Sequence, residues 1–237
     1  MNLLAFDTST DALSIALGKG AQVWQHSGAG GAQASATLIP AIMALMSQAG
    51  LRFDDLDAIA FGRGPGSFTG LRTACSVAQG LAFGAGVPVL PVDTLLAVAE
   101  EARFQLNAIK ALRVMSLLDA RMDEVYAACY EFDGKVWTQH GDYSLCRPEE
   151  LRQSKPAGDD WQIAGNAYAV YGVRLPMMAA TPLHALPTAA AMLRLAPALL
   201  ANGQALPADQ ALPTYIRDKV AKTTFERQVE KTATLAI

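Results

Sequence analysis

The sequence of 237 residues is 51% hydrophobic and 17% charged, and its 19 basic and 22 acidic residues give a formal net charge of −3. This composition is typical of a soluble globular protein, excludes a disordered chain and argues against a stand-alone nucleic-acid binder. The three cysteines, Cys75, Cys129 and Cys146, are odd in number and lack Cys-x-x-Cys spacing. They exclude a disulfide framework and a zinc knuckle, and they predict a reducing, cytoplasmic location.

No membrane segment is expected. The apolar run before Asp7 is too short for a secretory signal and carries no basic leader. The longest helical apolar stretch, residues 189–201, is interrupted by Arg194 and Pro197 and falls short of the roughly 20 apolar residues that span a bilayer.

Three short strands are predicted at the start of the chain. An apolar run at residues 3–6 ends at Asp7 and is followed by the polar residues 8–10. Residues 13–17 alternate between apolar and small or polar side chains, the period of a strand with one buried face. After a glycine turn, residues 23–24 continue as a third strand, so the segment predicts a meander.

The same pattern recurs in the middle of the chain. A second apolar run, residues 114–118, is closed by Asp119 and followed by a strand at 125–130, an Asp-Gly turn and a further strand at 136–137. Asp7 and Asp119 lie 112 positions apart (119 − 7), nearly half the chain. The recurrence predicts a duplication.

Two lobes are therefore expected. We place the first lobe at residues 1–105 and the second at 106–218, and we expect residues 219–237, which mix charges without apolar periodicity, to form a mobile tail.

Two helices are predicted in the first lobe. One spans residues 35–49, with Pro40 in or just after its first turn and Gly50 at its end. It has almost no polar face. The other, at about residues 69–84, is dense in small residues that permit close helix approach. Either both helices pack on the sheet, or they form a helix-pairing surface for a partner. The residues predicted to make this surface are Leu38, Ile42, Leu45, Met46, Leu71, Cys75 and Ala78.

The most distinctive segment is the glycine-rich run at residues 62–72, which follows a strand at 58–61 and precedes a helix. Backbone N–H groups at such a helix N-terminus can bind an anion. The spacing is neither that of a P-loop nor Gly-x-Gly-x-x-Gly. The alternative is a tight strand-to-helix turn capped by Ser67 or Thr69. The motif residues singled out are Gly64, Pro65, Gly66, Ser67, Phe68, Thr69, Gly70 and Arg72.

No metal site is predicted. The three histidines, His26, His140 and His184, stand alone in the sequence and form no His-x-x-x-His pair. We expect surface histidines rather than metal ligands.

Four segments together resemble the TsaB (YeaZ) family: residues 7–10, 62–72, 118–121 with 124–126, and 213–217. The resemblance runs from the first strand to about Val220. The family belongs to the bacterial machinery that makes threonylcarbamoyladenosine in tRNA, next to the anticodon. The resemblance implies an α/β fold with two lobes of the ASKHA type (actin-like ATPase, sugar kinase and Hsp70), in agreement with the duplication.

The resemblance also implies a non-catalytic scaffold. Such a subunit pairs through its first lobe with its paralogue TsaD, which carries the metal and transfers the threonylcarbamoyl group. TsaC supplies the threonylcarbamoyl adenylate, and TsaE is an ATPase that joins the complex. No cofactor of its own is implied, because ATP and metal are expected on the partner subunits. Alone, the chain is expected to form a homodimer, and it meets tRNA through the complex.

The loops after the first strand of each lobe support the non-catalytic interpretation. ASKHA enzymes hold ATP phosphates on these loops and normally use glycine there. Here the first loop is Asp7-Thr8-Ser9, with Ser9 in place of glycine, and the second runs from Asp119 to Arg121, whose side chain would occupy the space of a phosphate. We interpret both as degenerate cradles, with Arg121 either binding an anion or forming a structural salt bridge.

Two rival functions stay open: an ASKHA-type ATPase or kinase, and a glycoprotease-like metallopeptidase. No catalytic residue is singled out for either. One departure from the family is residues 30–35, where related sequences often place a histidine or long polar residues.

Overall fold

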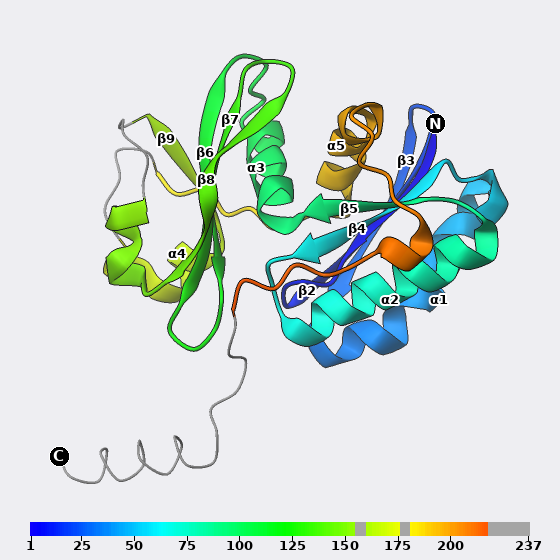
Figure 1. The fold of residues 1–237 in the computed structure, drawn as a ribbon, viewed down its shortest axis with the longest axis horizontal. Helices are drawn as coiled ribbons and strands as arrows, with labels where there is room; N and C mark the ends of the chain where they lie inside the picture. The colour runs from blue at the N-terminus through cyan, green and yellow to red at the C-terminus, as the bar shows by residue number, and fades with distance from the viewer. Residues whose placement is uncertain (155–159, 176–180, 218–237) are drawn as a thin grey trace, which may run out of the picture.

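The computed structural model describes residues 1–154, 160–175 and 181–217, which form two α/β lobes (Figure 1). The first lobe is built on a five-stranded sheet in the order β3-β2-β1-β4-β5, in which β1, β2 and β3 are an antiparallel meander and β4 and β5 run parallel to β1. Its strands are β1 (Asn2–Asp7), β2 (Ala12–Lys19), β3 (Gln22–Ala29), β4 (Ala58–Gly64) and β5 (Val89–Asp93).

The second lobe repeats this topology in a four-stranded sheet, in the order β8-β7-β6-β9. Its meander is β6-β7-β8, and β9 runs parallel to β6 as β4 does to β1. The strands are β6 (Leu112–Asp119), β7 (Val125–Phe132), β8 (Trp137–Cys146) and β9 (Trp161–Gly165). The duplicated α/β architecture predicted from the sequence is confirmed, with both Asp7 and Asp119 at the end of a lobe's first strand.

Helices cover the sheets. The α-helices are α1 (Ala34–Ala49), α2 (Phe68–Ala85), α3 (Thr94–Gln105), α4 (Ala167–Tyr171) and α5 (Ala189–Ala201). Short 3-10 turns span Gly31–Gln33, Phe53–Asp55, Pro148–Ser154, Gly172–Arg174 and Ala208–Gln210. Helices α1 and α2 lie side by side on one face of the first sheet, and α3 lies between the lobes (Figure 1). Among the described residues, no helix combines the length and hydropathy needed to cross a bilayer.

Helix α1 forms where its apolar periodicity predicts. Leu38, Ile42 and Leu45 recur at helical spacing and are buried against the first sheet. The helix ends at Gly50, whose φ of 60° is left-handed and therefore favours glycine, as predicted. Pro40 lies in the second helical turn, just after the first, so the carbonyl of Ala36 has no N–H at position 40 to accept from.

Helix α5 corrects the predicted lobe boundary. The sequence division places it in the second lobe, whereas its residues Met192 and Ala196 pack against the first sheet. The reason is that the face of the first sheet opposite α1 and α2 is lined by small side chains such as Ala5 and Ala60, which leave room for a closely packed helix. The chain directly after α5 stays with the first lobe, where Leu206 pairs with Val89 of β5. The predicted tail at 219–237 lies outside the described residues.

Candidate functional site

The loop after β1 is buried. Asp7, Thr8 and Ser9 are each no more than 3% exposed. The Ser9 N–H and hydroxyl both donate to Asp7 Oδ1, at 2.8 and 2.6 Å, and the Thr8 hydroxyl donates to the carbonyl of Gly70 at 2.6 Å. The polar groups that would face a phosphate in an open loop are therefore used inside the chain.

The glycine-rich motif covers this loop. The Ser67 N–H donates to the Ser9 carbonyl at 2.8 Å, and a Cβ added at Gly66 would lie 2.6 Å from Ser9 Cβ. A Cβ at Gly70 would lie 1.8 Å from the Thr8 carbonyl oxygen. Glycine is needed at both positions because the backbone of the motif touches the first loop. Gly64 differs, since its φ of 117° itself favours glycine.

Ser67 caps helix α2; it is one of the two residues, Ser67 and Thr69, that the sequence predicts for this role. Its side chain accepts from the Gly70 N–H at 3.2 Å, while Thr69 lies inside the helix. The motif is thus a capped strand-to-helix turn, one of the two alternatives given by the sequence. Its glycines Gly66 and Gly70 make the contact with the first loop.

The second loop, between β6 and β7, is held by its own contacts. Asp119 Oδ1 accepts from the Arg121 N–H at 2.8 Å and from the Tyr171 hydroxyl at 2.7 Å. Arg121, Met122 and Asp123 all have left-handed backbones, with φ of 59°, 54° and 65°. Three consecutive non-glycine residues in this region are uncommon and have to be stabilised by their surroundings.

Arg217 supplies part of that stabilisation. Its guanidinium donates to the Ala120 carbonyl at 3.0 Å and to the Arg121 carbonyl at 3.3 Å, and it pairs with Glu124. The Arg121 side chain leaves the loop and pairs with Asp11 of the first lobe and, at 3.5 Å, with Asp119. Arg121 is therefore a salt-bridged residue that joins the two loops.

A cleft of about 280 Å³ lies between the two loops. Its lining includes Ser9, Asp11, Ser67, Phe68, Asp119, Arg121, Met122, Asn166, Tyr215 and Arg217. At its rim, Phe68 and Tyr215 have ring centroids 5.4 Å apart, and the Arg72 guanidinium lies 3.8 Å from the Phe68 centroid. Because Arg121 and Arg217 already have carboxylate partners, an anion entering the cleft would have to compete with Asp11 and Glu124 for them.

Burial changes the protonation of Asp7. It raises the pKa of this carboxyl from 3.8 to about 6, although the hydroxyl and N–H of Ser9 both act to lower it. Asp7 Oδ2 has no hydrogen-bond partner among the described residues, and it lies against Gly62, where an added Cβ would come within 1.8 Å. Ser9 and Gly62 therefore enclose the Asp7 carboxyl within the chain.

The three histidines lie apart and are exposed, as expected. His140 is 2.9 Å from Glu131 on the neighbouring strand β7. Within residues 1–154, 160–175 and 181–217, no group of three His, Cys, Asp or Glu side chains is placed to hold a metal ion.

The residues predicted for the helix-pairing surface are buried in the chain itself, which corrects that prediction. None of Leu38, Ile42, Leu45, Met46, Leu71, Cys75 and Ala78 is more than 5% exposed. All except Leu71 belong to one core cluster with the first sheet. Cys75 is additionally covered by the chain after α5, since its thiol donates to the Ala211 carbonyl at 3.3 Å. These side chains face the sheet because it offers the larger apolar surface.

The outer face of the same helices carries a different set of apolar side chains. Ile39 and Met43 of α1 are 46% and 52% exposed, and Phe83 of α2 is 82% exposed. Next to Phe83, a Cβ added at Gly80 or Gly84 would meet no atom within 4 Å, so α2 is flat there. The sequence signal for this face was the i, i+4 spacing of Ile39 and Met43, which the prediction did not use.

Comparisons with known proteins identify the family. A family model of tRNA N6-adenosine threonylcarbamoyltransferase (TsaD) matches residues 29–235. Two proteins named tRNA threonylcarbamoyladenosine biosynthesis protein TsaB are similar to the chain: the one from Escherichia coli is 33% identical, covering 93% of this chain and 96% of the relative, and the one from Haemophilus influenzae is 34% identical, covering 93% and 95%. The chain belongs to the TsaB (YeaZ) family. The structure of YeaZ from Pseudomonas aeruginosa, 39% identical, superposes with a TM-score of 0.81 over 91% of this chain and 99% of that one.

The TsaB-family motifs predicted from the sequence meet around the cleft. Its walls combine residues of the Asp7–Thr10 loop, the glycine motif, the loop at Arg121 and the segment ending at Arg217. Three contributors to the cleft were missed at the sequence level: Asp11, Met122 and Asn166. Asp11 had a signal, because an acidic residue directly after the first loop is a natural partner for an arginine in the second.

Proposed function

We propose that this chain is a non-catalytic subunit that acts in the cytoplasm with TsaC, TsaD and TsaE in forming threonylcarbamoyladenosine at the tRNA adenosine next to the anticodon. The names of its TsaB-family relatives support the pathway. Its kinship with the transferase itself is supported by the TsaD family model.

The observation that carries the non-catalytic role is the burial of residues 7–9 under the glycine motif. An ASKHA enzyme needs backbone N–H groups of this loop free for phosphates. In this chain the Ser9 N–H donates to Asp7, and Gly66 and Gly70 contact the backbone of the loop. Opening it would break these hydrogen bonds and expose buried polar groups, which is unfavourable.

The surface proposed to dock TsaD is the outer face of α1 and α2, defined by Ile39, Met43, Gly80, Phe83 and Gly84. Exposed apolar side chains beside glycines allow another pair of helices to approach closely. Specific interfaces bury roughly 1,200–2,000 Å² in total, and a four-helix arrangement can supply much of that area. In the absence of TsaD, the same face would serve a homodimer.

Reconstitution tests the proposal. Purified TsaC, TsaD and TsaE are incubated with unmodified tRNA, threonine, bicarbonate and ATP, with and without this protein, and modified adenosine is quantified by mass spectrometry. Modification should depend on the added chain, while the chain alone should hydrolyse no ATP. Full modification without it, or ATP turnover by the isolated chain, would overturn the proposal, and the second result would favour the ATPase rival.

A further inference from the structure

A second cavity of about 360 Å³ lies between the lobes, apart from the cleft already described. The first lobe contributes β4, β5, α3 and α5 to its walls, and the second contributes β7 and β8. Its volume is in the range of pockets that hold small molecules. Nothing in the proposed docking role uses it.

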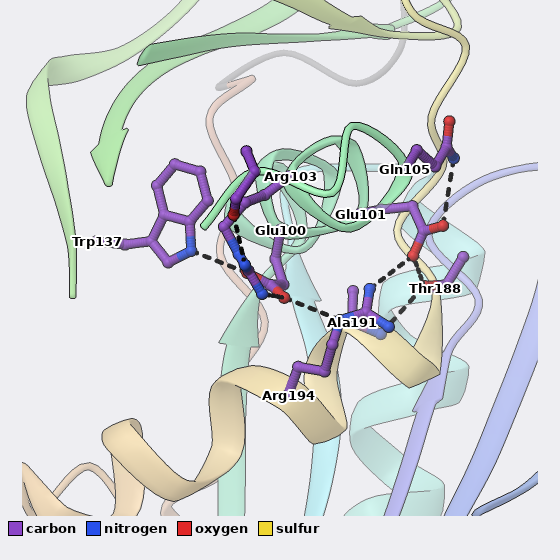
Figure 2. A network of polar contacts seen from close by, with 9 residues as sticks. Glu100, Glu101, Arg103, Gln105, Trp137, Thr188, Ala191 and Arg194 are labelled. Atoms are coloured by element: carbon purple, nitrogen blue, oxygen red, sulfur yellow. Dashed lines mark hydrogen bonds and ion pairs between the residues drawn. The ribbon is translucent and has the colours of Figure 1, made fainter. Parts of the chain in front are cut away.

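One wall of the cavity is a polar network whose charged groups are already paired with one another (Figure 2). Glu100 accepts from Arg103 at 2.7 Å, from Arg194 at 2.8 Å and from the Trp137 indole N–H at 3.1 Å. Arg194 also pairs with Glu101 at 2.8 Å. These charges satisfy one another, so they are poor candidates for recognising a ligand.

The remaining polar residues of the wall are incompletely paired. Arg63 donates to Asp93 Oδ2 at 3.3 Å, and the Tyr143 hydroxyl donates to the same oxygen. Asp93 Oδ1, Arg63 Nε and the Tyr130 hydroxyl have no hydrogen-bond partner among the described residues. Asp93 and Tyr130 are both more than nine-tenths buried. Buried polar groups without partners are rare in folded proteins and point to a missing ligand or water.

Three aromatic side chains also line the cavity. Trp137 lies 5.2 Å from Phe132 and 6.5 Å from Tyr130, measured between ring centroids, and all three residues line the cavity. Pro91 and Leu199 add apolar surface. Lys135 also lines the cavity.

We propose that this cavity binds a small α-amino acid with an apolar side chain. The carboxylate would lie on the free edge of the Arg63 guanidinium, the ammonium group would donate to Asp93 and Tyr130, and the side chain would pack against Trp137. A zwitterion fits better than a simple anion or cation because the site presents one guanidinium and one carboxylate side by side.

The state of Asp93 agrees with this choice. Burial raises the pKa of Asp93 to about 6 even though the Arg63 guanidinium acts to lower it, so one cation does not fully compensate the buried carboxylate. An ammonium group would add the missing positive charge. The proposal requires small movements of all three side chains, because Asp93 Oδ1, the Tyr130 hydroxyl and Arg63 Nε are each shielded from solvent in the structure. It is independent of the docking role.

Calorimetry on the full-length chain tests the proposal with three probes that share one ring: L-phenylalanine, 3-phenylpropionate without the ammonium group, and phenethylamine without the carboxylate. L-Phenylalanine should bind about ten-fold or more tightly than either fragment, the loss expected from one charge-assisted hydrogen bond. No binding of L-phenylalanine at millimolar concentration, or equal binding of 3-phenylpropionate, would overturn it.

Variants locate the site. Asp93→Asn and Arg63→Gln should each weaken L-phenylalanine binding by about ten-fold or more. Arg52→Gln is the matched control, since its side chain is 80% exposed on the first lobe and does not line the cavity. Circular dichroism establishes that each variant is folded. Unchanged affinity in both folded cavity variants would overturn the assignment, and the comparison of probes on the unaltered chain decides the matter if either fails to fold.

Discussion

The buried carboxyl of Asp7 gives a prediction about pH. Its pKa is raised from 3.8 to about 6, so the folded protein binds a proton at this site in a range where the unfolded chain has lost it. The site therefore favours folding most below about pH 4, and this contribution is lost as pH rises toward 6. The difference in pKa corresponds to up to about 3 kcal/mol.

Asp7→Asn should remove this dependence. Asparagine keeps an oxygen that accepts from Ser9. Its uncharged amide NH2 group replaces Oδ2, which has no partner among the described residues. Relative to the unaltered chain, the variant should gain stability as pH rises from about 4 to 6. Urea unfolding at several pH values measures the difference, with the exposed Asp142→Asn as control. A difference that stays constant across this range would contradict the burial argument.

The glycines of α2 allow a matched pair of substitutions. Gly70→Ala would place Cβ 1.8 Å from the Thr8 carbonyl oxygen, so it should destabilise the fold by about 1–3 kcal/mol or more. Gly80→Ala meets no atom within 4 Å, and should stabilise the isolated chain by up to about 1 kcal/mol. Thermal unfolding compares the two. Equal effects would show that Gly70 is not held by contact with the first loop.

The sequence indicates which residues of the glycine motif matter, but not what they contact. The glycine motif and Ser67 were singled out from their spacing, and Ser67 is a helix cap. That Gly70 touches Thr8 could not be predicted, because the two lie 62 positions apart and only the pairing of β1 with β4 brings them together.

At the scale of elements, α1 shows why the outward-facing residues were assigned wrongly. Periodicity reveals orientation when polar positions mark one side of a helix. In α1 both Leu38 and Ile39, and both Ile42 and Met43, are apolar, so the pattern fits two rotations of the helix. The structure selects the one that places Leu38 and Ile42 against the sheet. Strand β5 and helix α3 were not located by the sequence reading.

The corrected faces lead to a prediction about association. Ile39→Glu combined with Phe83→Glu should weaken binding to TsaD by about ten-fold or more and leave the fold intact, because both side chains are exposed. Val173→Glu, a fully exposed site in the second lobe, is the control. Leu45→Glu should instead unfold the chain, since it buries a charge in the core. Light scattering and calorimetry measure the outcome. Unchanged affinity in the double variant would exclude this face.

At the scale of the whole molecule, the duplication was predictable from the sequence. The packing of α5, which follows the second lobe in the chain, on the sheet of the first lobe was not. The order of the meander strands, β1-β2-β3 and β6-β7-β8, follows from the recurring hairpin pattern, whereas the places of β4, β5 and β9 do not. The placement of α5 on the first sheet depends on the small side chains of Ala5 and Ala60, which leave a face that a helix from later in the chain covers together with part of α3. Sequence order alone does not state which sheet such a helix covers.

Glu100 joins these elements and carries the last prediction. It lies on α3, is 2% exposed, and binds Arg103 of the same helix, Arg194 of α5 and Trp137 of the second lobe. Burial raises the pKa of Glu100, but the hydrogen bonds from these three partners outweigh it and hold the pKa below its usual value. The carboxylate is therefore charged in the folded state at neutral pH, where its partners need it.

Glu100→Gln should destabilise the chain by about 1–3 kcal/mol at neutral pH, because it leaves Arg103 without its carboxylate partner and Arg194 with Glu101 alone in a partly buried site. The matched control is Glu149→Gln, whose carboxylate pairs with Arg174 at 2.6 Å but is half exposed, so its loss should matter little. Urea unfolding followed by tryptophan fluorescence and by circular dichroism measures both variants. If the two substitutions had equal effects, the network between the lobes would contribute no more than a surface ion pair, and the joining of α3, α5 and β8 would rest on apolar packing alone.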